Sequence, residues 1–142
     1  MKNFRKLTSL LAVFALIAAL LCGCASEKAP QKSTDITFDT TETVFGEGAS
    51  SFTLEVTNVD GETKAFEVRT DETVVGKALL DIGLIAGEDG DYGLYVKTVM
   101  GITLDYDTDG KYWAFYIDGE YAMTGVDQTE LVSGSTYAFR AE

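Results

Sequence analysis

The strongest strand signal in this chain lies in "LDYDTDGKYWAFYIDGEY", residues Leu104 to Tyr121. Its centre, "KYWAFYI", is rich in aromatic and β-branched residues, and the turn-forming pairs Asp109-Gly110 and Asp118-Gly119 bound it. Because successive side chains of a strand point to opposite faces, one face carries Trp113, Phe115 and Ile117, and the other carries Tyr112, Ala114 and Tyr116. Both faces are therefore apolar or aromatic, and a helix can cover only one of them.

Outward from this strand, period-two patterns predict further strands. Apolar and polar residues alternate from Phe52 to Thr57, Asp60-Gly61 then favours a tight hairpin turn of type I′, and Phe66 to Arg69 form the return strand. Later runs of the same kind predict strands over Tyr92–Val99, Gly101–Tyr106, Glu120–Met123 and Thr136–Glu142.

One helix is predicted in "TDETVVGKALLDIGLIAG". Its apolar residues recur at three- and four-residue spacing, which gives a single apolar stripe: Val75, Ala78, Leu79 and Ile82. Asp71 or Thr73 can cap its start, and Gly83 suits a left-handed C-terminal cap followed by an apolar contact from Leu84. The sequence thus predicts an α+β fold, a mixed sheet packed on a single helix.

The N-terminus has the features of a secretory signal peptide over residues 1–23: three basic residues precede an apolar run that is too short to span a bilayer. The run ends in "LCGC", which resembles the lipobox of bacterial lipoproteins and makes Cys24 the expected lipidation site. An ordinary cleaved signal or a short membrane anchor is the alternative. Two acyl chains on Cys24 would hold the mature chain at the extracytoplasmic face of the cell membrane through the lipid anchor only.

Residues 24–50 read as a polar tether rich in Ser and Thr, and residues 51–142 as the folded domain. All 23 acidic residues but only 8 of the 11 basic residues follow the predicted signal, so the mature charge is 8 − 23 = −15. Such a surface repels nucleic acid and anionic lipid. The chain has no histidine, which removes the usual general base and the usual zinc ligand, and we expect a protein that is not an enzyme.

The aromatic strand is the first candidate site. If one face meets the helix, the other can offer a platform for a flat organic ligand or a protein partner, with Tyr112, Trp113 and Tyr116 as the binding residues. The alternative is a central strand buried between the helix and loops such as Glu120 to Leu131. Both interpretations predict a largely buried Trp113.

The second candidate is a calcium site at Asp105, Asp107 and Asp109. These residues match the first half of an EF-hand loop, in which alternate carboxylates converge on the ion, but Tyr116 stands where the bidentate carboxylate belongs. Asp118 or Glu120 can complete a weak site of the extracellular kind. A solvated turn is the alternative here, and also for the second acidic loop, Gly87 to Gly93.

The stretches "VVGKALLDIGLI", "YGLYVKTVMGI" and "YWAFYIDGEYAMTGVDQTELVSGSTYAF" together resemble the bacterial domain family DUF4430, which is related to the C-terminal domain of transcobalamin and intrinsic factor. The resemblance implies a β-grasp-like fold on an exported protein. It also implies a corrinoid (cobalamin-like) ligand, although this chain lacks the helical domain that closes on cobalamin in the carriers. We therefore expect a surface lipoprotein that binds a small molecule for uptake, with a surface transporter component as partner. The alternative function is a calcium-binding structural or adhesion module.

Overall fold

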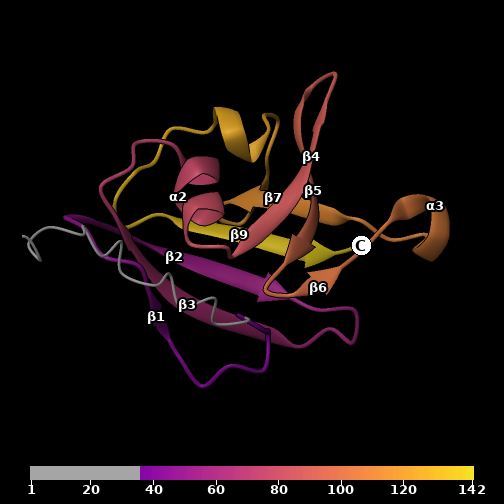
Figure 1. Cartoon of the computed structure of the whole chain (residues 1–142), viewed down its shortest axis with the longest axis horizontal. Helices are drawn as coiled ribbons and strands as arrows, with labels where there is room; N and C mark the ends of the chain where they lie inside the picture. The colour runs from indigo at the N-terminus through magenta and orange to yellow at the C-terminus, as the bar shows by residue number, and fades with distance from the viewer. Residues whose placement is uncertain (1–35) are drawn as a thin grey trace, which may run out of the picture. The chain divides into compact units, whose positions relative to one another are not determined.

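The computed structural model describes residues 36–142, so the predicted signal peptide and Cys24 lie outside the described residues. The strands of the larger sheet are β1 (Val44–Phe45), β2 (Ser50–Thr57), β3 (Thr63–Thr70), β7 (Trp113–Ile117), β8 (Glu120–Tyr121) and β9 (Thr136–Ala141). They lie in the order β1-β3-β2-β9-β7-β8 (Figure 1). β1 runs parallel to β3 and β2 parallel to β9, whereas the other neighbours are antiparallel. The mixed sheet expected from the sequence is confirmed.

A second, three-stranded sheet consists of β4 (Ile85–Gly90), β5 (Gly93–Val99) and β6 (Ile102–Thr103). Its buried residues join those of helix α2 (Val75–Asp81) and of one face of the larger sheet in one hydrophobic core. The helix therefore shares that face with a small sheet. β4 was not predicted, because its sequence "IAGEDG" has the glycine and acidic residues that strands usually lack.

Helix α2 ends as the sequence predicts. Gly83 adopts a positive φ of 76°, and the Gly83 and Leu84 N–H groups donate to the carbonyls of Leu80 and Leu79. This pattern is a Schellman motif, and Leu84 is fully buried beside it. The predicted N-terminal cap is wrong: the N-cap residue is Val74, and the Val75 N–H donates to the Thr129 carbonyl instead.

The two hairpin turns differ from each other. At Asp118-Gly119 both residues have positive φ, 48° and 88°, which fits the type I′ turn that Asp-Gly favours. At Asp60-Gly61 only the glycine has positive φ, so type I′ is wrong there. The turn is longer because the Asn58 side chain accepts hydrogen bonds from the Asp60 and Glu62 N–H groups.

The folded unit begins before Ser51, where the sequence placed its start. Phe38 and Phe45 are buried, and β1 pairs with β3 through Phe45 and Val68. Lys64 fastens this segment further, since its ammonium group donates to the Phe38 carbonyl. The described part of the expected tether, residues 36–50, is thus packed on the domain, because two aromatic side chains within its polar sequence find the core.

Two short helical segments complete the structure: α3 (Tyr106–Asp109) and the 3₁₀ segment η1 (Val126–Gln128), which packs on α2. α3 replaces the end of the strand predicted over Gly101–Tyr106. None of the helices within residues 36–142 has the length and apolar character to cross a membrane.

Candidate functional site

Strand β7 presents different residues on its two faces, as predicted. Trp113 points to the helix side and is 6% exposed, with its indole N–H donating to the Ile102 carbonyl at 3.2 Å. The prediction of a buried Trp113 is confirmed. The structure therefore separates Trp113 from Tyr112 and Tyr116, with which the sequence had grouped it as a binding residue, because neighbouring strand residues alternate between faces.

The opposite face of β7 carries a cluster of tyrosines. Tyr112 and Tyr116 are half-buried on it, and Tyr121, which pairs with Tyr116 across the β7–β8 hairpin, is 54% exposed. The Tyr116 and Tyr121 rings meet edge to face with centroids 5.4 Å apart. Tyr106 of α3 approaches Tyr112 in the same manner at 6.3 Å. We call Tyr106, Tyr112, Tyr116 and Tyr121 the tyrosine cluster.

Larger side chains on the outer face cover the small residues between them. Ala114 and Ala138 also point to this outer face, yet they are only 1% and 3% exposed, so their larger neighbours must cover them. One cover is Arg140, the partner of Ala114 in the β7–β9 ladder, whose guanidinium carbon lies 4.0 Å from the Tyr116 ring centroid. This distance is that of a stacked cation–π contact.

Glu142 contacts the same ring from its polar end, since the Tyr116 hydroxyl donates to the Glu142 carboxylate. This hydrogen bond, together with partial burial, raises the pKa of Tyr116 above its usual value of 10.0, against a smaller lowering by Arg140. The pKa of Tyr112 is also raised. The first cause is electrostatic repulsion between the ionised forms of Tyr112 and Tyr121, and the second is partial burial. Both phenols therefore remain neutral donors and acceptors across the physiological pH range.

The loop Glu120 to Leu131 was expected to cover this face under the alternative of a central buried strand, but only Tyr121 at its start contacts the tyrosines there. Its η1 segment packs against α2, and Val126 enters the core. At the edge of the cluster there is instead a shallow hollow of about 410 Å³, lined by Ile117, Asp118, Glu120, Tyr121, Ala122 and Met123.

The acidic loop folds as a single helical turn. Asp105 is the N-cap of α3, and one of its carboxylate oxygens accepts from the Asp107 N–H at 3.0 Å. Asp109 reaches back and accepts from the Asp105 N–H at 2.8 Å. Gly110 closes the turn in the left-handed conformation. The carboxylates of Asp105 and Asp109 are thus used to satisfy backbone N–H groups at the helix start.

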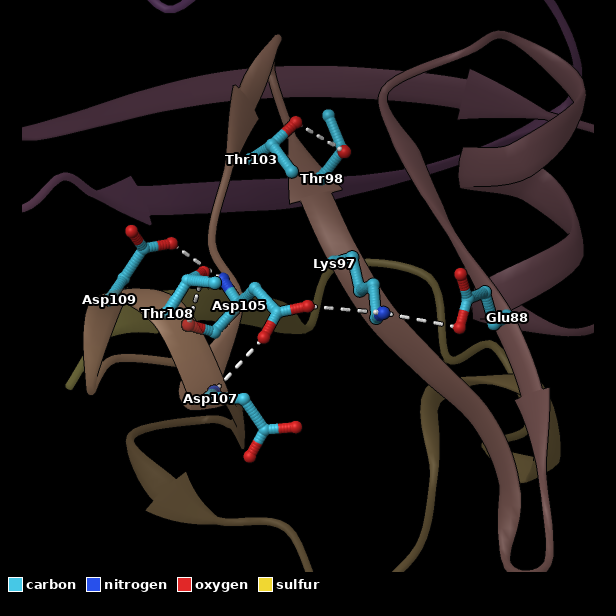
Figure 2. A network of polar contacts seen from close by, with 8 residues as sticks. All are labelled: Glu88, Lys97, Thr98, Thr103, Asp105, Asp107, Thr108 and Asp109. Carbon is cyan, nitrogen blue, oxygen red and sulfur yellow. Dashed lines mark hydrogen bonds and ion pairs between the residues drawn. The ribbon is translucent and has the colours of Figure 1, made fainter.

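A lysine supplies the positive charge beside this turn. Figure 2 shows Lys97 between Asp105 and Glu88, with its ammonium nitrogen 3.3 Å and 3.1 Å from their carboxylate oxygens. The contacts with both carboxylates raise the pKa of Lys97, and the contact with Glu88 has the larger effect. The Asp107 N–H and then Lys97 lower the pKa of Asp105.

This arrangement does not fit a calcium ion at Asp105, Asp107 and Asp109. Their carboxylates point in different directions, and a lysine ammonium occupies the side of Asp105 that a cation would need (Figure 2). Within residues 36–142, no three acidic or cysteine side chains are grouped so that they can hold a metal ion. An EF-hand type of site needs alternate carboxylates that converge on the ion, whereas in this helical turn those of Asp105 and Asp109 accept from backbone N–H groups.

Of the sequence-predicted residues, the structure brings Tyr112 and Tyr116 together and adds four that were missed: Tyr106, Tyr121, Arg140 and Glu142. Tyr121 was within reach of prediction, because the hairpin turn at Asp118-Gly119 fixes its register opposite Tyr116. Arg140 lies on β9 and Glu142 directly follows it; both are distant from β7 in sequence, and no local pattern reveals that pairing.

Comparison with known proteins places the chain among relatives. It is 31% identical to a protein of Ruminococcus gnavus ATCC 29149 described as a candidate metal-binding protein, over 66% of this chain and 97% of that one, with a TM-score of 0.62. Haptocorrin in complex with Cbi is 18% identical over 69% of this chain and 26% of haptocorrin, with a TM-score of 0.49. No curated protein matches. The model of the DUF4430 family, a domain of unknown function, matches residues 71–141, and the chain belongs to this family.

Proposed function

We propose that this chain is a surface-anchored binding protein whose tyrosine cluster holds a flat organic molecule. The observation that carries the proposal is the aromatic surface on the outer face of β7: Tyr106 and Tyr121 are 61% and 54% exposed, and Tyr112 and Tyr116 are half-buried beside them. Phenol rings offer apolar area for stacking and a hydroxyl for hydrogen bonding at little entropic cost.

The anchoring part of the proposal rests on the sequence. A lipid on Cys24 would keep the domain at the extracytoplasmic face of the membrane, where a ligand can be bound and passed to a transporter component. Binding is favoured over catalysis because the chain has no histidine, and the polar groups beside the cluster are a stacked arginine and a hydrogen-bonded carboxylate.

A corrinoid is the first ligand to test, because of the family resemblance to the cobalamin carriers. One face of a small sheet encloses little of such a large ligand, so a corrinoid should bind to the isolated domain only weakly. Tighter binding would require a second protein that closes on the exposed side.

The test is calorimetric titration of the domain with cyanocobalamin, since Trp113 lies on the opposite face and is a poor reporter. Tyr121→Ser should weaken binding at least several-fold, because it removes an exposed ring of the cluster. Tyr92→Ser is the matched control, since Tyr92 is 95% exposed at the β4–β5 turn, outside the cluster. Equal affinities of the two variants would reject the tyrosine cluster as the site.

A metal-binding function is the second candidate, supported by the description of the Ruminococcus gnavus relative. To bind at α3, a cation would have to displace Lys97 from Asp105, so affinity should be low. Melting temperatures measured with calcium and with chelator decide between the two functions, because binding to the folded state alone raises Tm by linkage.

A further inference from the structure

The described residues contain six basic side chains, and they differ in how their charges are met. Four of them lie within 4.0 Å of a carboxylate oxygen: Lys64, Arg69, Lys77 and Lys97. Within residues 36–142, Arg140 and Lys111 have no such partner. Of these two described residues, Arg140 lies on the tyrosine cluster, and Lys111 immediately precedes Tyr112 in the sequence.

Arg140 is the more informative of the two because it is half-buried and held in place. Its guanidinium carbon lies 4.0 Å from the Tyr116 ring centroid, and the Glu142 carboxylate accepts a hydrogen bond from the Tyr116 hydroxyl rather than from Arg140. The guanidinium also interacts with the Tyr116 hydroxyl, and because it carries five N–H groups, others remain for a ligand. These N–H groups form a planar fork that matches the two oxygens of a carboxylate or phosphate.

The charge of the whole chain makes this arrangement selective. With 23 acidic residues against 11 basic ones, the molecule repels anions in general. An arginine without an acidic partner gives such a chain a local site that attracts anions. An anion binds there most tightly when its apolar part also stacks on the neighbouring rings.

We propose that the ligand of the tyrosine cluster carries an anionic group, a carboxylate or a phosphate, which Arg140 binds while the rings of Tyr112, Tyr116 and Tyr121 hold its flat part. This inference rests on the proposed function and specifies the chemical class of the molecule bound there. Arg140 is then the residue that selects charged over uncharged forms of the same ring system.

Two matched pairs of probes test the proposal by calorimetric titration of the folded domain. Protoporphyrin IX and its dimethyl ester share a flat ring and differ in their carboxylates, whereas flavin mononucleotide and riboflavin differ in a phosphate. The anionic member of at least one pair should bind about tenfold more tightly, as expected for a charge-assisted contact. The pair that shows the larger ratio identifies which anion is preferred.

Arg140→Gln should abolish the preference, so that the anionic member and its uncharged partner bind with equal affinity. Arg140→Lys should restore part of it, because the charge returns without the planar fork. Arg69→Gln is the control, since Arg69 pairs with Glu67 on β3 and its loss should not affect the ratio.

The outcomes separate this inference from the function on which it rests. Equal binding of charged and uncharged probes, or an unchanged ratio in Arg140→Gln, overturns the anion preference while the cluster remains a binding site. Failure of all four probes and of cyanocobalamin to bind overturns both. A preference that Arg69→Gln removes as strongly as Arg140→Gln shows a general charge effect and also overturns the role of Arg140.

Discussion

Tyr106, the first residue of α3, meets the Tyr112 ring edge to face with centroids 6.3 Å apart. This contact joins the two features that the sequence presents separately, the acidic loop and the aromatic strand. The helical turn that Asp105 caps is what places Tyr106 beside the sheet. The acidic residues therefore contribute to the candidate site indirectly, because the turn that they stabilise positions one ring of the tyrosine cluster.

Asp105→Ala should loosen this turn and weaken ligand binding at a distance. The substitution removes the N-cap hydrogen bond to the Asp107 N–H and the contact with Lys97, so we expect Tm to fall by a few degrees. Calorimetric titration should show a weaker affinity for the same ligand. Asp107→Ala is the matched control, because within the described residues no hydrogen bond or ion pair involves its exposed carboxylate; an equal loss in both variants would contradict the capping role.

The sequence predicted the strands, the helix and the two faces of β7, because these depend on local periodicity. It could not predict that Asp105–Asp109 form a helical turn, since the decisive partner, Lys97, reaches this segment only through the β5–β6 hairpin. From sequence alone, the alternate carboxylates were as consistent with a calcium-binding loop as with a helical turn. Local patterns show which residues can cap a helix or bind a metal ion. Tertiary contacts decide which of these two roles the residues take.

In the candidate site, too, some residues could be predicted from local periodicity and others could not. Tyr112 and Tyr116 could be assigned to one face from the strand period alone. Arg140 could not, because its position depends on the antiparallel register of β7 and β9, which places Ala114 opposite Arg140. The helix cap is a related case: the Thr129 carbonyl takes the part that Asp71 or Thr73 was expected to play.

The contribution of Lys97 should depend on pH. The pKa of Asp105 is lowered in the folded protein, so its stabilising effect is present above the usual value of 3.8 and is lost as the pH falls through the folded pKa. Lys97→Met should therefore unfold at lower urea concentration than the parent at neutral pH, and the difference should shrink in acid below that range. A difference that stays constant with pH would show that lost packing, rather than charge, explains the effect.

The Tyr116–Glu142 contact predicts a response at alkaline pH. Because the pKa of Tyr116 is raised, its stabilising effect is present below 10.0 and is lost as the pH rises through the folded pKa. Glu142→Gln should bring the tyrosinate absorbance of Tyr116, and to a smaller extent that of Tyr112, to lower pH. Glu47→Gln, an exposed carboxylate outside the cluster, should leave the titration curve unchanged; a shift in both variants would mean that general charge is responsible.

Phe45 tests where the folded unit begins. It is 5% exposed, and its ring lies 5.7 Å from that of Phe66 in the core. If residues 36–50 belong to the domain, Phe45→Ala should lower the free energy of unfolding by about 3 kcal/mol, as expected for a buried phenylalanine. Val44→Ala, at the neighbouring and 45% exposed position, should have little effect. Urea denaturation measures both, and a small loss for Phe45→Ala would restore Ser51 as the boundary.

Glycine is needed for different reasons at Gly76, within α2, and at Gly83, just after its end. A Cβ at Gly76 would lie 2.8 Å from the backbone of Asp127, whereas one at Gly83 would meet nothing within 4 Å but would be strained by a φ of +76°. We expect Gly76→Ala to lower the free energy of unfolding by about 2–3 kcal/mol through overpacking against η1, and Gly83→Ala to lower it by about 1 kcal/mol through backbone strain. Gly83→Asn should recover part of the second loss, because asparagine tolerates the left-handed conformation, while Gly76→Asn should be worse than Gly76→Ala. Urea denaturation of the four variants orders them, and equal losses for the two alanine variants would contradict the expected overpacking of Gly76→Ala against η1.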